Sequence, residues 1–211
     1  MIPMALLYPA KNMKKKVVLL LHEKGKDYAV NSESLANRLV ADGFTVVVGD
    51  LPGIGELGPG YLKGDAYLDN ISYNQWFAGI LTGRSIVGLR SEDIIRMGHF
   101  IEDELADHRS ISVLSLGVLG SEVLHSAVFD DAFQNVCLLH PFLSFAEIAM
   151  VRDYSPSFIP STVAGAIQSY DLADLIAVAC PRKLPNYPAF HNQQKVFDCI
   201  LAHGHFAVFR K

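Results

Sequence analysis

The segment ISVLSLGVLGSEVL, residues 111–124, most constrains what this chain can fold into, because it joins a strand to a helix through a tight turn. The β-branched run at 111–114 predicts a buried strand, and a helical pattern begins after Gly120. A turn of this kind holds the residue at its apex in strained dihedrals and exposes it above a sheet. The apex here is Gly117, which tolerates left-handed dihedrals but has no side chain with which to attack a substrate.

Strands and helices alternate along the rest of the chain. This order predicts an α/β fold with a doubly wound, mostly parallel sheet flanked by helices in a three-layer sandwich. Four apolar runs, separated by helix-length intervals, should lie parallel in one sheet with residues 111–115 central. The four runs are residues 17–21, 44–48, 111–115 and 136–139, and residues 196–201 are a last strand candidate. Helices are expected after a cap at Asn31 or Ser32, and at residues 73–81, 91–105, 118–128 and 170–178.

Length and composition fit one globular unit. The chain has 211 residues, of which 50% are hydrophobic and 19% are charged. We therefore expect a single domain over residues 1–211, with a loop excursion at 51–70 and a cap-like segment at 144–170. The net charge of -4 argues against a nucleic-acid or anionic-membrane partner.

The sequence predicts neither a metal nor a cofactor. Cys137, Cys180 and Cys199 are an odd number at long spacings, which fits neither a disulfide framework nor a zinc pattern. His203 and His205 could form half a metal site, but the tail supplies no carboxylate to complete it. The chain shows no signal peptide and no run of membrane-spanning length, so it is expected to be cytoplasmic as given, or a fragment of a secreted protein.

Residues 53–58, GIGELG, form a literal G-x-G-x-x-G after a strand, the pattern of a dinucleotide-binding turn. Pro59 and Gly60 follow, so the motif does not open a helix whose N-terminus could hold a pyrophosphate. We expect a turn-rich loop that covers the carboxyl ends of the strands and binds no dinucleotide, with a nucleotide-binding domain as the remaining alternative.

Six segments in order carry a family resemblance: VVLLLHEKGK, FTVVVGDLPGIGELGPG, SYNQWFAGILTGRSIVGLRSEDIIR, SVLSLGVLGSEVLHSAVFDD, FLSFAEIAMVRDYSPSFIP and SYDLADLIAVACPRK. Together they resemble the α/β-hydrolase family, and more closely its acetyl xylan esterase-like, carbohydrate esterase-like branch. The resemblance implies a serine nucleophile, a histidine base and an acid that together remove acetyl groups from sugars. It also implies a small-molecule or carbohydrate ester as substrate, and it is compatible with a homo-oligomer.

The resemblance transfers only some of these roles. His203 or His205 could be the base, and Ser115 or Ser121 are the hydroxyls near the apex. The stretch PNYPAF at 185–190, where the acid is expected, has no carboxylate. We therefore expect a catalytically impaired member of the family, with an active esterase and a non-catalytic ligand-binding domain as alternatives. The candidate oxyanion or ligand positions are His22, Glu23, Gly25 and Leu116.

Two further groups of side chains invite an interpretation. Arg84, Arg90 and Asp93 predict a buried arginine–aspartate pair that braces the turn, because charges removed from water need partners. Tyr73, Trp76 and Phe77 could form a platform on which a sugar stacks, although such aromatic residues more often belong to a core or a cap.

Overall fold

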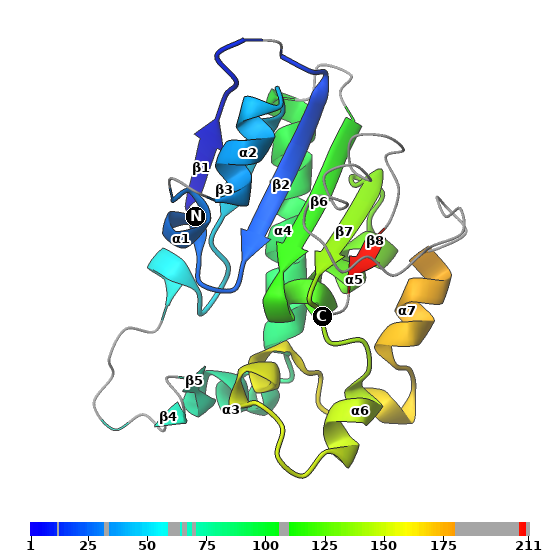
Figure 1. Ribbon diagram of the computed structural model, residues 1–211. Coiled ribbons are helices and arrows are strands. Elements are labelled where there is room, and N and C mark those ends of the chain that lie inside the picture. The colour runs from blue at the N-terminus through cyan, green and yellow to red at the C-terminus, as the bar shows by residue number, and fades with distance from the viewer. Residues whose placement is uncertain are drawn as a thin grey trace.

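A computed structural model of the chain describes residues 1–11, 13–31, 34–58, 64, 67–68, 71–105, 110–179 and 207–209 (Figure 1). Its main sheet has six strands in the order β1-β3-β2-β6-β7-β8. The strands β2, β3, β6, β7 and β8 run parallel, and β1 pairs antiparallel with β3 at the edge. Their bounds are β1 Met4–Leu7, β2 Lys16–His22, β3 Thr45–Gly49, β6 Ser110–Leu116, β7 Asn135–Leu139 and β8 Ala207–Phe209.

The prediction of four parallel strands with the strand before the turn in the centre is confirmed. β6 lies between β2 and β7, and both of its neighbours are parallel to it. The edge strand β1 was not predicted. It has four residues and no buried one, so it lacks the continuous apolar run that marks the central strands.

Helices cover both faces of this sheet, so the fold is a three-layer α/β sandwich. Side chains on one face, such as Leu19 and Val113, pack against α4, α5 and α7. Side chains on the other face, such as Leu20 and Leu114, pack against α1 and α2. The bounds of these helices are α1 Lys26–Ala29, α2 Leu35–Ala41, α4 Ile86–Glu104, α5 Gly120–Phe129 and α7 Leu172–Ala179.

Several helix ends differ from the sequence prediction. The helix predicted from residue 91 begins at Ile86, because the hydroxyl of Ser85 accepts a hydrogen bond from the Gly88 amide and caps it. The cap of α2 is Ser34, rather than Asn31 or Ser32. The turn after β6 inserts a 3₁₀ helix, Gly117–Leu119, so α5 begins later than expected.

A group of short elements lies beyond the carboxyl ends of β2 and β6 (Figure 1). It contains α3 Tyr73–Leu81, a small hairpin of β4 Tyr67–Leu68 and β5 Ile71–Ser72, α6 Phe145–Met150, and the 3₁₀ helices Pro156–Ser161 and Ala166–Gln168. Helix α6 lies in the segment at 144–170 that the sequence predicts to be cap-like. The helix at 73–81 has the predicted bounds.

Some predicted features lie outside the described residues. These are the strand candidate at 196–201 and the residues His203, His205, Cys180 and Cys199. Cys137 is buried in β7. None of the helices in the described part of the chain is long and apolar enough to cross a membrane.

Candidate functional site

The turn after β6 has the geometry that the sequence predicts. β6 ends at Leu116, Gly117 has a φ of 77°, and a single 3₁₀ turn leads into α5. This positive φ is one that residues with a side chain rarely adopt, which explains the glycine. The turn lies at the carboxyl edge of the central strand, where open α/β sheets bind their ligands.

A carboxylate from another strand occupies the apex of this turn. Glu23 follows β2, and its Oε2 accepts a hydrogen bond of 3.1 Å from the backbone amide of Val118. A Cβ atom built on Gly117 would overlap the same carboxylate. In this conformation the exposed Glu23 side chain fills the space above the apex and binds the first amide beyond it, which an oxyanion could use.

His22, the last residue of β2, accepts two hydrogen bonds from the loop that follows it. The amide of Lys24 donates to Nδ1 of His22 at 3.0 Å, and the amide of Gly25 donates to the His22 carbonyl at 2.9 Å. Burial lowers the pKa of His22, which agrees with a neutral ring whose Nδ1 accepts a hydrogen bond. Two of the amides expected to receive an oxyanion are thus engaged within the loop.

The candidate nucleophiles lie inside the protein. The side chains of Ser115 and Ser121 are fully buried, and neither hydroxyl oxygen has a hydrogen-bond partner among the described residues. A nucleophile has to be exposed at the apex, and both of these serines are buried. Leu116 pairs with His22 in the sheet register at the end of both strands.

The loops after β2 and β3 are held together by one buried aspartate. Asp50 follows β3, and its two carboxylate oxygens accept hydrogen bonds from the amides of Lys26 at 2.6 Å and Glu56 at 2.9 Å. A side chain at Gly55 would overlap the Asp50 carboxylate. Gly55, the middle glycine of G-x-G-x-x-G, is therefore required by this contact between the loops. It begins a 3₁₀ turn, Gly55–Leu57, and not an α-helix.

The Lys26 side chain closes the same contact. Its Nζ forms ion pairs with Glu56, with Asp27 at 3.2 Å and with Asp50 at 3.6 Å. The hydrogen bond to Glu56 is the main cause that raises the pKa of Lys26 above its ordinary value, and the hydrogen bond to Asp27 and the charge of Asp50 add to it. The lysine is thus held as a cation by three carboxylates.

A buried ion pair lies behind the turn, as predicted, but its acidic residue is Glu122 and not Asp93. Arg90 on α4 pairs with Glu122 on α5 at 2.8 Å, and both side chains are buried. The hydroxyl of Ser161 donates to the same Glu122 oxygen at 2.8 Å. The prediction of an arginine–aspartate pair was wrong, because Asp93 pairs instead with Arg96 one helical turn along the surface of α4. Residues three apart on a helix differ by only about 60° around its axis, so helical spacing alone could not exclude a pair of Arg90 with Asp93, and the position of Glu122 depends on how α5 packs.

His140 is a residue that the sequence analysis did not single out. It follows β7 with a φ of 56°, the one positive φ outside glycine among the described residues. The register pairs Leu139 with Leu116, so His140 follows directly beside the apex of the turn. Residues with a strained backbone cluster at active sites and ligand clamps, but the sequence around such a residue does not indicate the strain.

The aromatic residues of α3 lie in the group of elements beyond the carboxyl edge. The rings of Trp76 and Phe77 meet edge to face with centroids 5.2 Å apart, and Phe77 is half exposed. Within the described ranges, no three His, Cys, Asp or Glu side chains are grouped so that they could hold a metal ion.

Comparison with known proteins places the fold. No family model matches this chain, and no curated protein matches it. Among solved structures, it is similar to a Bacteroides fragilis protein provisionally assigned as an acetyl xylan esterase, with a TM-score of 0.66 and 15% identity over 99% of this chain. This chain spans 62% of the length of that protein. A cold-adapted esterase from an Arctic intertidal metagenomic library is 24% identical over 65% of this chain and 54% of its own, with a TM-score of 0.47.

The similarity to the Bacteroides fragilis structure covers nearly the whole chain and agrees with the parallel sheet, the central β6 and the tight turn after it. The chain therefore has the α/β-hydrolase fold. The glycine-rich loop after β3 continues into a 3₁₀ turn and not into an α-helix.

Proposed function

We propose that this protein is a non-hydrolytic member of the α/β-hydrolase fold, which binds an ester-bearing small molecule or carbohydrate at the carboxyl edge of its sheet without cleaving it. The observation that carries the proposal is Glu23 at the apex of the turn. Its carboxylate lies where a nucleophilic side chain would project from residue 117, and it binds the Val118 amide. A negative charge at that position would repel the oxyanion that ester hydrolysis creates.

The buried serines support the same proposal. A hydroxyl at Ser115 or Ser121 would have to leave the core to reach a substrate carbonyl. The substrate class rests on the structural similarity alone, because the Bacteroides fragilis structure is provisionally assigned as an acetyl xylan esterase.

Hydrolysis of 4-nitrophenyl acetate by the whole chain tests the absence of catalysis. We expect a rate no higher than that of buffer with an equal amount of a heat-denatured sample. Ser115→Ala and His205→Ala should leave that rate unchanged, since without a nucleophile the base has no proton to take. A turnover that either variant abolishes would show an active esterase and overturn the proposal.

A serine at position 117 tests whether Glu23 prevents catalysis in addition to the missing hydroxyl. Gly117→Ser alone should remain inactive and unreactive toward a fluorophosphonate probe, because its side chain competes with Glu23 for the same space. The double variant Gly117→Ser with Glu23→Gly removes that competition, and any gain in labelling should appear only there. Labelling of Gly117→Ser alone at the same rate would show that Glu23 does not block the apex.

Binding needs its own measurement. Acetylated xylo-oligosaccharides should raise the melting temperature of the whole chain in a concentration-dependent way, since a ligand of the native state stabilises it. The deacetylated oligosaccharides are the matched control. If neither set shifts the melting temperature, the binding half of the proposal is wrong, whatever the outcome for hydrolysis.

A further inference from the structure

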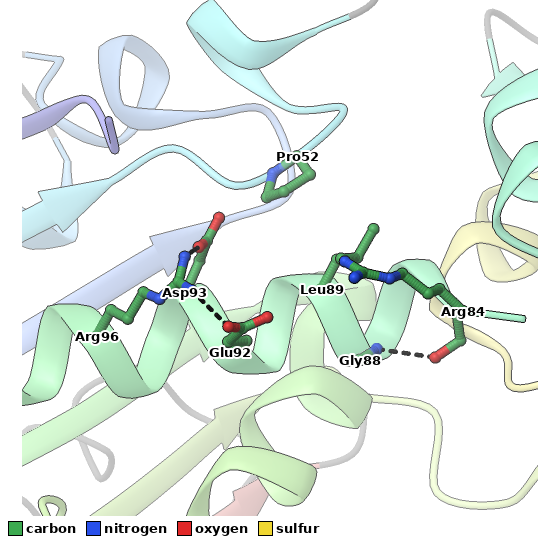
Figure 2. A pocket seen from close by; sticks show the side chains of 8 residues that line it. Pro52, Arg84, Gly88, Leu89, Glu92, Asp93 and Arg96 are labelled. Atoms are coloured by element: carbon green, nitrogen blue, oxygen red, sulfur yellow. Dashed lines mark hydrogen bonds and ion pairs between the residues drawn. The ribbon is translucent and has the colours of Figure 1, made fainter. Parts of the chain in front are cut away.

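A pocket of about 560 Å³ lies between the outer face of α4 and the loop after β3 (Figure 2). Sites for small molecules usually have about 300–1,000 Å³, so the pocket is large enough for one. The first half of α4 and Pro52 line it, and none of Glu23, Gly117 or Val118 does. It is therefore separate from the turn that the proposed function concerns.

One end of the pocket carries an uncompensated positive charge. Arg84 precedes α4, its side chain is exposed, and none of the described residues pairs with its guanidinium. Figure 2 shows this side chain extending along the helix toward Leu89. An exposed guanidinium without a partner can bind a carboxylate through two parallel hydrogen bonds.

The other end carries an excess of negative charge. Arg96 pairs with Glu92 at 2.5 Å and with Asp93 at 3.3 Å (Figure 2), so two carboxylates share one guanidinium. Burial raises the pKa of Asp93, although the neighbouring Arg96 acts in the opposite direction. A second cation would therefore find an incompletely compensated, partly desolvated carboxylate at this end.

Apolar and fixed groups separate the two charged ends. Leu89 and Pro52 line the middle, and Gly88 leaves it open by having no side chain. The Pro52 carbonyl accepts a hydrogen bond of 2.9 Å from Nε of Arg90, which is itself locked against Glu122. The wall facing α4 is thus held in place before any ligand binds, which lowers the entropic cost of binding.

We propose that this pocket binds a short zwitterionic peptide, with its carboxylate on Arg84 and its ammonium group toward Glu92 and Asp93. The Arg84 side chain extends toward Leu89, and four residues of helix from Leu89 to Asp93 span about 6 Å. An extended peptide covers at most about 3.3–3.6 Å per residue, so two residues fit this separation. The charges of a single amino acid are too close together to reach both ends.

Titration of the isotopically labelled whole chain with the dipeptide Ala-Leu, followed by amide chemical shifts, tests the proposal. We expect saturable shifts concentrated in Ser85 and in the residues of α4 from Ile86 to Arg96. Amidating the peptide carboxylate or acetylating its amine should each weaken binding about fivefold, the size of a partly exposed ion pair.

Arg84→Gln supplies the decisive comparison. In this variant, amidation of the peptide should no longer weaken binding, because the group that recognised the carboxylate is gone. Glu92→Gln should likewise reduce the penalty of acetylation. Arg38→Gln removes an exposed arginine from α2 on the other side of the sheet and should leave all three affinities unchanged.

Two results would overturn the peptide site. One is the absence of saturable shifts in α4 at any accessible peptide concentration. The other is an equal penalty for amidation in the wild type and in Arg84→Gln, which would mean that the carboxylate does not contact Arg84. Neither result bears on hydrolysis at the turn, so failure here is distinguishable from failure of the proposed function.

Discussion

Any side chain at position 117 has to compete with Glu23 for one volume. Gly117→Ala places a methyl group into that carboxylate and also forces a φ of 77° on a residue that disfavours it. We expect a loss of about 1–3 kcal/mol in the free energy of unfolding, the usual cost of such backbone strain. Urea titration measures it, and Glu23→Gly in the same chain should recover the steric part of the loss. If that second change recovers nothing, the overlap with Glu23 is not what makes the glycine necessary.

The buried pair behind the turn makes a second residue-scale prediction. Glu122→Ala leaves the Arg90 guanidinium buried without its carboxylate, which typically costs about 3–5 kcal/mol in the free energy of unfolding. The double variant Arg90→Met with Glu122→Leu removes both charges and should regain most of this loss. Arg96→Met, which breaks an exposed pair on the same helix, should cost less than about 1 kcal/mol. Equal losses for Glu122→Ala and Arg96→Met would contradict the importance of burial.

At the scale of elements, a helix or strand could be predicted where its own residues show a hydrophobic pattern. The central strands are continuous apolar runs because both faces of the sheet are covered, so they could be predicted. The short edge strand β1 and the six-residue α6 have no such pattern, because pairing with β3 and a distant capping residue stabilise them. Elements whose stability comes from tertiary contacts do not show in a single-sequence pattern.

Helix α6 depends on that distant residue. Asp171 accepts hydrogen bonds from the Ser144 hydroxyl at 2.6 Å, the Phe145 amide at 2.6 Å and the Ala146 amide at 3.3 Å. Burial alone would raise the pKa of Asp171, but these hydrogen bonds outweigh it and lower the pKa. The stabilisation is therefore complete above the ordinary aspartate pKa and is lost as the pH falls through the lowered one.

We accordingly expect Asp171→Ala to cost about 1 kcal/mol at neutral pH, as the loss of a helix cap does. The cost should shrink as the pH falls below the ordinary aspartate pKa of about 4, because the unfolded wild-type chain then binds a proton that the folded chain does not. Chemical unfolding at pH 7 and pH 3 measures the two values, with Asp153→Ala as a control at an exposed aspartate. A cost that is the same at both pH values would show that the charge of Asp171 does not matter.

For the whole molecule, the site was harder to predict than the fold. The glycine at the apex could be predicted from the turn alone, since the strand, the turn and the helix are adjacent in sequence. Glu23 and Val118 are 95 positions apart, and only the parallel pairing of β2 with β6 brings them together. The register also places His140 next to the apex, which no local pattern could indicate.

The stability of the whole fold should also depend on pH through one imidazole. Buried His125 donates from Nδ1 to the Ser121 carbonyl at 2.7 Å, and its Nε2 accepts from the Tyr170 hydroxyl at 2.8 Å. Burial lowers the pKa of His125 and outweighs the hydrogen bond to Ser121 and the charge of Glu122. The folded protein therefore holds a neutral ring at pH values where the unfolded chain binds a proton.

It follows that the free energy of unfolding should fall as the pH drops below about 6.5, by at most about 1.4 kcal/mol per pH unit for one proton. The fall should stop once the pH has passed the lowered pKa of the folded state. Urea titrations between pH 7.5 and pH 5 measure this slope, and His125→Gln should remove the part that this imidazole contributes. Tyr170→Phe is the matched control, because it deletes the hydroxyl partner but keeps the buried ring and hence the slope. A slope of the same size in His125→Gln would mean that another group binds the proton.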